Sequence, residues 1–158
     1  METRHPNITP SDSCHPPPTS ARSAAVRVSP FAETVLVVDD DPMVRDVEAQ
    51  ILRLNGYTVF EAESAAEALR MAGEPAPIHL LITDLSMPEI DGLELTRRFR
   101  TMRPETPMLM VSGSLPLLRD RIQELDQFEF MAKPFAFSDL LHKVRTILDA
   151  TNPVSQDR

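Results

Sequence analysis

The stretch Thr34-Val35-Leu36-Val37-Val38-Asp39-Asp40-Asp41 decides the fold of this chain. Its first part is apolar and rich in β-branched residues, a pattern typical of a buried strand. The aspartates at its end repel one another and lose hydration if they are buried, so they need water, a helix N-terminus or a metal ion beside them. The stretch therefore predicts a strand that delivers acidic groups to a site.

A second strand-like run, residues 78–83, also ends at an aspartate, Asp84. If the two strands are parallel neighbours, the carboxylates of Asp39, Asp40 and Asp84 meet at one edge of the sheet. Such a cluster suits a hard divalent cation with oxygen ligands. The two runs together indicate a metal site built from strand ends.

The composition is that of one ordinary globular unit. The chain has 158 residues, of which 42% are hydrophobic, and a net charge of -8. This charge argues against general affinity for nucleic acid or an anionic membrane. Cys14 is the only cysteine, so no intramolecular disulfide is possible, and no apolar run has the length of a membrane span or a secretion signal. We expect a cytoplasmic protein that binds neither DNA nor a membrane.

The two ends of the chain differ from its middle. Residues 1–32 are rich in proline and serine and show no apolar period, which is typical of a disordered tail. Residues 151–158 read as a flexible C-terminus. We therefore expect the folded unit over 33–150 and, with so few residues after it, we expect no output domain.

Strand-like and helix-like patterns alternate through this unit, which predicts an α/β fold with a doubly wound parallel sheet and helices on both faces. Ligands of such sheets bind beyond the carboxyl ends of the strands. The five expected strands cover residues 34–39, 57–61, 78–83, 107–111 and 128–132.

Apolar residues spaced by three and four predict which helix faces turn to the core. Asp41 and Pro42 form a good cap and first turn for the first helix. The expected stripes are Met43, Val47, Ile51 and Leu54 in the first helix; Leu95, Phe99 and Met102 in the third; Leu118, Ile122 and Leu125 in the fourth; and Leu140, Val144, Ile147 and Leu148 in the last.

Four motifs, in this order, resemble the receiver domain of bacterial two-component response regulators, of the single-domain, chemotaxis-receiver type. They lie at residues 37–42, 83–92, 111–113 and 133–135. The resemblance implies a five-stranded, flavodoxin-like receiver fold. It also implies a phosphoacceptor switch rather than an enzyme, with at most intrinsic autophosphorylation and autodephosphorylation.

The resemblance assigns roles to the acidic strand ends. Asp84 would accept a phosphoryl group from a sensor histidine kinase or a histidine phosphotransfer protein. Asp39, Asp40, Asp84 and the backbone carbonyl of Ser86 would hold Mg²⁺ (or Mn²⁺). A divalent cation suits phosphoryl transfer because it reverses the negative charge that three carboxylates present to a phosphate.

Further roles follow from the same resemblance. Ser112 and Lys133 would bind the phosphoryl group, the first as a hydroxyl donor and the second as a point charge. Phe130 would be a switch residue, although a plain core phenylalanine fits equally well. Ser86 and Ser114 would flank the attacking water and tune the phosphoryl lifetime.

The lysine count supports the role of Lys133. The chain has two lysines, Lys133 and Lys143, against fourteen arginines, and one of the two stands at the required strand end. The face formed by residues 115–148 would then carry the signal to an unknown downstream protein.

Two alternatives from other classes stay open. A Mg²⁺-dependent phosphohydrolase of the haloacid-dehalogenase type would use the Asp39-x-Asp41 pattern with Ser112 and Lys133, and its nucleophile would be Asp39 instead of Asp84. A phosphorylation-independent interaction module would keep the same residues as a vestigial site.

Overall fold

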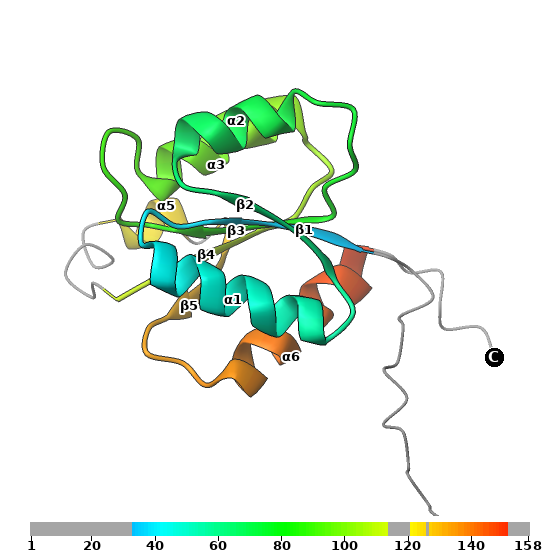
Figure 1. The fold of residues 1–158 in the computed structure, drawn as a ribbon. Helices are drawn as coiled ribbons and strands as arrows, with labels where there is room; N and C mark the ends of the chain where they lie inside the picture. Colours follow the sequence, from blue (N-terminus) through cyan, green and yellow to red (C-terminus); the bar gives the residue numbers. More distant parts are fainter. Residues whose placement is uncertain (1–32, 114–120, 126, 152–158) are drawn as a thin grey trace, which may run out of the picture.

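The computed structural model describes residues 33–113, 121–125 and 127–151. Its five parallel strands form one sheet in the order β2-β1-β3-β4-β5 (Figure 1). The strands are β1 (Thr34–Val38), β2 (Thr58–Ala62), β3 (Leu80–Asp84), β4 (Met108–Ser112) and β5 (Glu129–Ala132). The predicted doubly wound α/β fold is confirmed, although each strand after β1 begins one or two residues later than expected.

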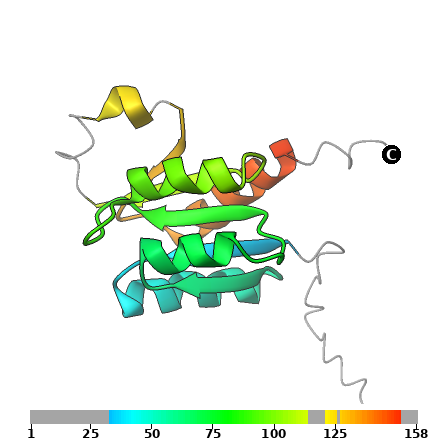
Figure 2. The same ribbon diagram turned by 90° about the horizontal axis from the view of Figure 1, so that it is seen from above.

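Helices cover both faces of the sheet. Helices α2 and α3 lie on one face and α1 and α6 on the other, while α5 lies beside one end of α3 (Figures 1 and 2). The helices are α1 (Pro42–Leu54), α2 (Ala65–Ala72), α3 (Gly92–Met102), α5 (Ile122–Leu125) and α6 (Phe137–Thr151). No helix among the described residues is both long and apolar enough to cross a membrane.

Alternation along β1 divides the core into two layers. Val35 and Val37 belong to the apolar cluster on the α1 and α6 side, whereas Leu36 and Val38 belong to the cluster on the α2 and α3 side. A strand that is buried on both faces needs apolar residues at every position, which explains the continuous run.

The predicted core faces of the later helices are largely confirmed. All four stripe residues of α6 are buried, and so are Leu95 and Phe99 of α3, whereas Met102 at the end of α3 is 46% exposed. Leu125 of α5 is buried, and Leu118 lies outside the described residues.

The predicted cap of α1 is also confirmed. The side chain of Asp41 accepts hydrogen bonds from the backbone N–H groups of Met43 and Val44, at 2.9 and 3.4 Å. This cap begins the helix directly after the last residues of β1, so α1 starts at the carboxyl edge of the sheet.

The predicted apolar stripe of α1 is wrong. Met43, Val47 and Leu54 are 78%, 43% and 79% exposed. The buried residues of the helix are instead Glu48, Ala49 and Leu52.

Two arginines explain this orientation. Arg45 donates from Nη1 to the backbone oxygen of Asp39 at 2.7 Å. Arg45 and Arg53 both pair with Glu61 of β2, at 3.6 and 2.7 Å. These contacts turn one side of α1 toward β2 and leave the predicted stripe facing solvent.

Replacing Arg145 by leucine should lower the free energy of unfolding by about 1–3 kcal/mol, because the buried carboxylate of Glu33 loses its partner. Arg145 donates from Nη1 and Nη2 to both carboxylate oxygens of Glu33, at 2.7 and 2.9 Å, and so ties α6 to the start of β1. Urea denaturation measures the change. The control is Arg70→Leu, whose exposed pair with Glu74 is worth less than about 1 kcal/mol. Equal losses in both variants would contradict the prediction.

Candidate functional site

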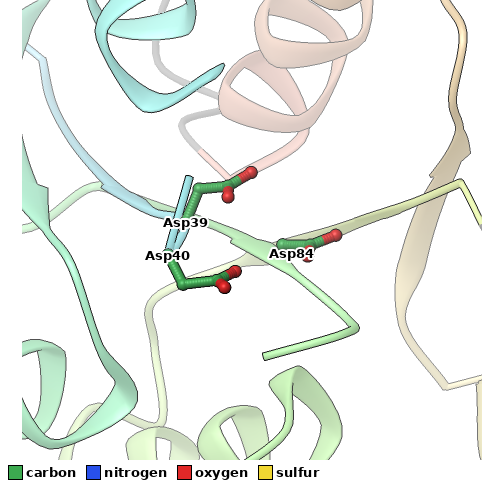
Figure 3. Close-up of side chains that lie close together, drawn as sticks. All are labelled: Asp39, Asp40 and Asp84. Carbon is green, nitrogen blue, oxygen red and sulfur yellow. The ribbon is translucent and has the colours of Figure 1, made fainter. Parts of the chain in front are cut away.

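Three aspartates meet at the carboxyl edge of the sheet (Figure 3). Asp39 and Asp40 follow β1, and Asp84 is the last residue of β3. The parallel register pairs Val38 with Thr83, so the residues after this pair lie side by side. One carboxylate oxygen from each of the three aspartates lies within 4.8 Å of the others.

This cluster fits a hard divalent cation. Magnesium and calcium bind carboxylate oxygens at about 2.0–2.6 Å, so one ion placed among Asp39, Asp40 and Asp84 can reach all three. The donors are all oxygens, which suits Mg²⁺ or Mn²⁺ better than a softer metal. Asp39 is 3% exposed, whereas Asp40 is open to solvent, so a cation would have access from the pocket side.

Lys133 supplies the positive charge of the site. Its backbone N–H donates to the backbone oxygen of Ser112 at 2.8 Å, which fixes it beside the end of β4. Its Nζ donates to Oδ2 of Asp39 at 3.1 Å and lies 3.7 Å from Oδ1 of Asp84. The peptide bond between Lys133 and Pro134 is cis.

Burial and the neighbouring charges shift the pKa values of Asp84 and Lys133. Burial raises the pKa of Asp84, and the nearby charges of Asp39 and Asp40 raise it further, against the opposing effect of Lys133. Burial lowers the pKa of Lys133, but its hydrogen bond to Asp39 and the surrounding carboxylates outweigh this and raise it. The crowded carboxylates therefore favour a cation beside them.

An open pocket of about 330 Å³ gives access to these groups. It is lined by Asp39, Asp41, Val44, Asp84, Ser86, Gly113 and Lys133. Ser86 is exposed at this pocket, whereas Ser112, which precedes the lining residue Gly113, is buried at 1% exposure.

The structure brings most, but not all, of the predicted site residues to the same edge of the sheet. Asp39, Asp40 and Asp84 converge with Lys133, and the backbone contact of Lys133 brings Ser112 to the same edge. Phe130 lies apart from the pocket lining: it is half-buried and packs against the cluster of Leu85, Leu93, Met110 and Leu125. Ser114 lies outside the described residues.

The loop after β3 is held close to the site. Asp91 caps α3 by accepting from the backbone N–H of Glu94 at 2.9 Å, and it pairs with Arg121 at 2.6 Å. The backbone N–H of Gly92 donates to the oxygen of Leu85 at 3.0 Å. The helix α3 therefore begins directly against the end of β3.

Sequence reasoning missed Glu48, an acid on the buried face of α1 with 4% exposure. Burial raises its pKa from 4.5 to about 7; Lys133 lowers it, and Asp39 and Asp84 raise it. Because the folded pKa is raised, Glu48 costs no stability below its ordinary pKa, and the full cost is present above a pH of about 7. The sequence held one signal that Glu48 could be buried: it stands directly before Ala49, on a helix whose apolar residues lie on two sides.

The chain matches the family model described as the response regulator receiver domain over residues 35–145. It therefore belongs to this family, whose members are phosphoacceptor switches of two-component signalling rather than enzymes of the classical kind. The match argues against the phosphohydrolase alternative.

Relatives support the same family. Response regulator MprA of Mycobacterium leprae (strain TN) is 36% identical over 121 residues, which are 75% of this chain and 52% of the relative. The chain thus spans about half the length of the curated relatives it matches.

Solved structures agree with these sequence comparisons. A CheY-like receiver domain protein from Methanospirillum hungatei JF-1 superimposes with a TM-score of 0.69 at 30% identity, covering 78% of this chain and 98% of that one. For the chemotaxis protein CheY4 of Vibrio cholerae, the TM-score is 0.67 at 28% identity, over 74% of this chain and 99% of that one.

Replacing Gly92 by alanine should lower the free energy of unfolding by about 1–3 kcal/mol and weaken Mg²⁺ binding. A Cβ there would lie 2.2 Å from the backbone oxygen of Asp84 and 2.9 Å from the Cα of Leu85, so the end of β3 must move. Urea denaturation and Mg²⁺ titration measure the two effects. Gly73→Ala is the control, because its Cβ meets nothing nearer than 3.4 Å. Unchanged Mg²⁺ binding in Gly92→Ala would contradict the second effect.

Proposed function

We propose that the chain receives a phosphoryl group on Asp84, with a divalent cation held by Asp39, Asp40, Asp84 and the backbone carbonyl of Ser86. The observation that carries this proposal is the different exposure and hydrogen bonding of the carboxylates of Asp39 and Asp84. Asp39 already accepts from the backbone N–H of Asp41 at 2.9 Å and from Nζ of Lys133 at 3.1 Å. The side chain of Asp84 is more exposed than that of Asp39 and lies farther from Lys133, so Asp84 is the better placed nucleophile.

The transfer is a simple exchange of bonds. An ionised oxygen of Asp84 attacks the phosphorus of a phosphohistidine, the P–N bond breaks, and its electron pair stays on the imidazole nitrogen, which takes up a proton from solvent. A bound divalent cation would neutralise the carboxylates and the phosphoryl oxygens. Lys133 would bind one phosphoryl oxygen, and the hydroxyl of Ser112 would donate to another.

The signal would leave through the neighbouring β4 and β5 strands. Ser112 of β4 pairs with Ala132 of β5, and Ala132 lies two residues after Phe130. A shift of Ser112 toward the phosphoryl group would let Phe130 repack and change the 115–148 face for a downstream protein. A phosphoryl group needs to shift this equilibrium by only a few kcal/mol. Ser86 and Ser114 would tune how long the phosphoryl group persists.

The phosphodonor would be a sensor histidine kinase or a histidine phosphotransfer protein in the cytoplasm. The exposed side of α1 is a suitable contact for it, because Met43, Val47 and Leu54 present apolar side chains to solvent. Exposed apolar side chains that gather on one surface mark contacts with proteins. The helix begins directly behind Asp40, so a donor docked there would reach the pocket.

Phosphorylation should be lost in Asp84→Asn and kept, at a reduced rate, in Asp39→Asn. The asparagine at position 84 has no nucleophilic carboxylate, whereas the one at position 39 weakens only the cation site. Intact mass after incubation with acetyl phosphate and Mg²⁺ measures the gain of one phosphoryl group.

The opposite pattern would refute the proposal. If Asp84→Asn still forms a hydroxylamine-sensitive phosphoryl adduct and Asp39→Asn does not, Asp39 is the nucleophile. If the wild-type chain gains no phosphoryl group and binds no Mg²⁺, the chain is a phosphorylation-independent interaction module.

The double variant Met43→Ser, Val47→Ser should slow transfer from a kinase or phosphotransfer protein about tenfold, because it removes apolar area from the contact. Its phosphorylation by acetyl phosphate should not change, since the small donor does not need α1. Met102→Ser, on the opposite face of the sheet, is the control and should leave both rates unchanged. Equal slowing with the two donors would mean that the substitutions disturb the site and not the contact.

A further inference from the structure

Arg45 is a largely buried cation of α1 that takes no part in the proposed transfer. Its side chain is 16% exposed. Its Nη1 donates to the backbone oxygen of Asp39 at 2.7 Å, and its Nε lies 3.6 Å from the carboxylate of Glu61 in β2. Arg45 therefore joins three elements, α1, β2 and the end of β1, at the residue with which the acidic cluster begins.

The pairing of β1 with its neighbours ends directly before this contact. The registers of β1 with β2 and with β3 both stop at Val38. The backbone N–H of Asp39 still donates to the oxygen of Ala62 in β2, at 3.3 Å. The backbone oxygen of the same residue accepts from the guanidinium of Arg45, which satisfies a polar group at a buried position. The guanidinium thus continues the hydrogen bonding of β1 by one further peptide.

This contact fixes the peptide that carries Asp40. A peptide group is planar, so a hydrogen bond to the oxygen of Asp39 sets the orientation of the whole group, including the nitrogen of Asp40. Successive side chains of a strand point to opposite sides, but the carboxylates of Asp39 and Asp40 extend to the same side, where the chain bends (Figure 3). The orientation of this one peptide therefore decides whether both carboxylates reach the same cation.

The side chain of Asp40 depends on its backbone for its position. The carboxylate of Asp39 accepts from the backbone N–H of Asp41 and from Nζ of Lys133, at 2.9 and 3.1 Å. The carboxylate of Asp40 accepts no hydrogen bond and forms no ion pair with any residue that the structure describes. It is open to solvent, so its place beside Asp84 comes from its backbone.

We propose that Arg45 is a positioning residue for the divalent cation: by holding the backbone oxygen of Asp39, it presents the carboxylate of Asp40 to the cation. Glu61 is the anchor of Arg45, because its carboxylate holds the guanidinium from the β2 side. This inference rests on the proposed function, since it concerns the cation of that site.

The position and the charge of Arg45 have opposite effects on a cation. The guanidinium is a positive charge beside an acidic cluster, so by charge alone its removal would strengthen cation binding. Its removal also frees the peptide between Asp39 and Asp40. That change weakens binding, because residues that orient metal ligands typically contribute about tenfold or more to the affinity. The sign of the change in affinity therefore tells the two effects apart.

Titration of the full chain with Mg²⁺, at constant pH and ionic strength, measures that sign. Arg45→Met keeps an unbranched side chain without charge or donors, and it should bind Mg²⁺ about tenfold more weakly than the wild type. Arg45→Lys keeps the charge but loses the fork that contacts two partners, so its affinity should lie between the two. Equal or tighter binding in Arg45→Met would overturn the proposal.

Arg53→Met is the matched control. Arg53 lies on the same helix and pairs with the same Glu61 at 2.7 Å, but its backbone acceptor is the oxygen of Val59, at 3.1 Å. Its replacement should leave the Mg²⁺ affinity close to that of the wild type. A loss equal to that of Arg45→Met would show that any disturbance of α1 weakens the site, and the proposal would fail.

Backbone NMR of the metal-free protein tests the contact itself. The ¹³C signal of the Asp39 carbonyl and the amide signal of Asp40 belong to the peptide that Arg45 holds. Both signals should shift in Arg45→Met and keep their positions in Arg53→Met. If neither signal moves in Arg45→Met, the guanidinium does not hold this peptide and the proposal fails.

Glu61→Gln tests the anchor in a chain that keeps Arg45. It should weaken Mg²⁺ binding more in the wild type than in the Arg45→Met background, because the anchor matters only while the guanidinium is present. Equal weakening in both backgrounds would mean that Glu61 acts only through its charge, which would overturn the proposal.

The same titrations separate this inference from the proposed function. If the wild type binds Mg²⁺ but gains no phosphoryl group, the proposed function fails, while the affinities still decide the role of Arg45. If the wild type is phosphorylated and Arg45→Met binds Mg²⁺ as tightly as the wild type does, only the role of Arg45 is refuted. A wild type that binds no Mg²⁺ refutes both.

Discussion

Mutual repulsion among Asp39, Asp40 and Asp84 is the constraint around which this structure is arranged. Parallel strands end at the same edge of the sheet, so β1 and β3 bring these carboxylates within 4.8 Å of one another. The protein offsets part of this charge with Lys133, which β5 carries to the same edge through its backbone contact with Ser112. A cation would offset the rest, and this charge balance is the basis on which we propose the edge as a site for phosphoryl transfer.

Helix α1 connects this edge with the rest of the molecule. Asp41 begins the helix directly behind the acidic cluster, and Arg45 binds the backbone of Asp39 and the side chain of Glu61. These contacts set the rotation of the helix. One side then presents Met43 and its neighbours to solvent, and the other side buries Glu48. A single rotation thus decides both which apolar side chains of α1 are exposed and which acid is buried.

Much of the fold and site could be predicted because the relevant signals are local. Each strand is a short apolar run, and its acidic or polar terminus marks where ligands gather. The cap at Asp41 follows from its own side chain and the proline after it. The face of α1 could not be predicted in this way, since its apolar residues lie on two sides and contacts with other elements, β2 among them, choose between them. Glu48 was missed for the same reason.

The sequence by itself determined the alternation of strands and helices, the family, and the residues that stand at the carboxyl ends of the strands, because these depend on short-range periodicity and on motif order. Only the tertiary structure decided which carboxylate Lys133 bonds, which side of α1 is buried, and that this side carries a glutamate. Those outcomes depend on distances between segments far apart in the chain, and burial and charge act through such distances rather than through sequence spacing.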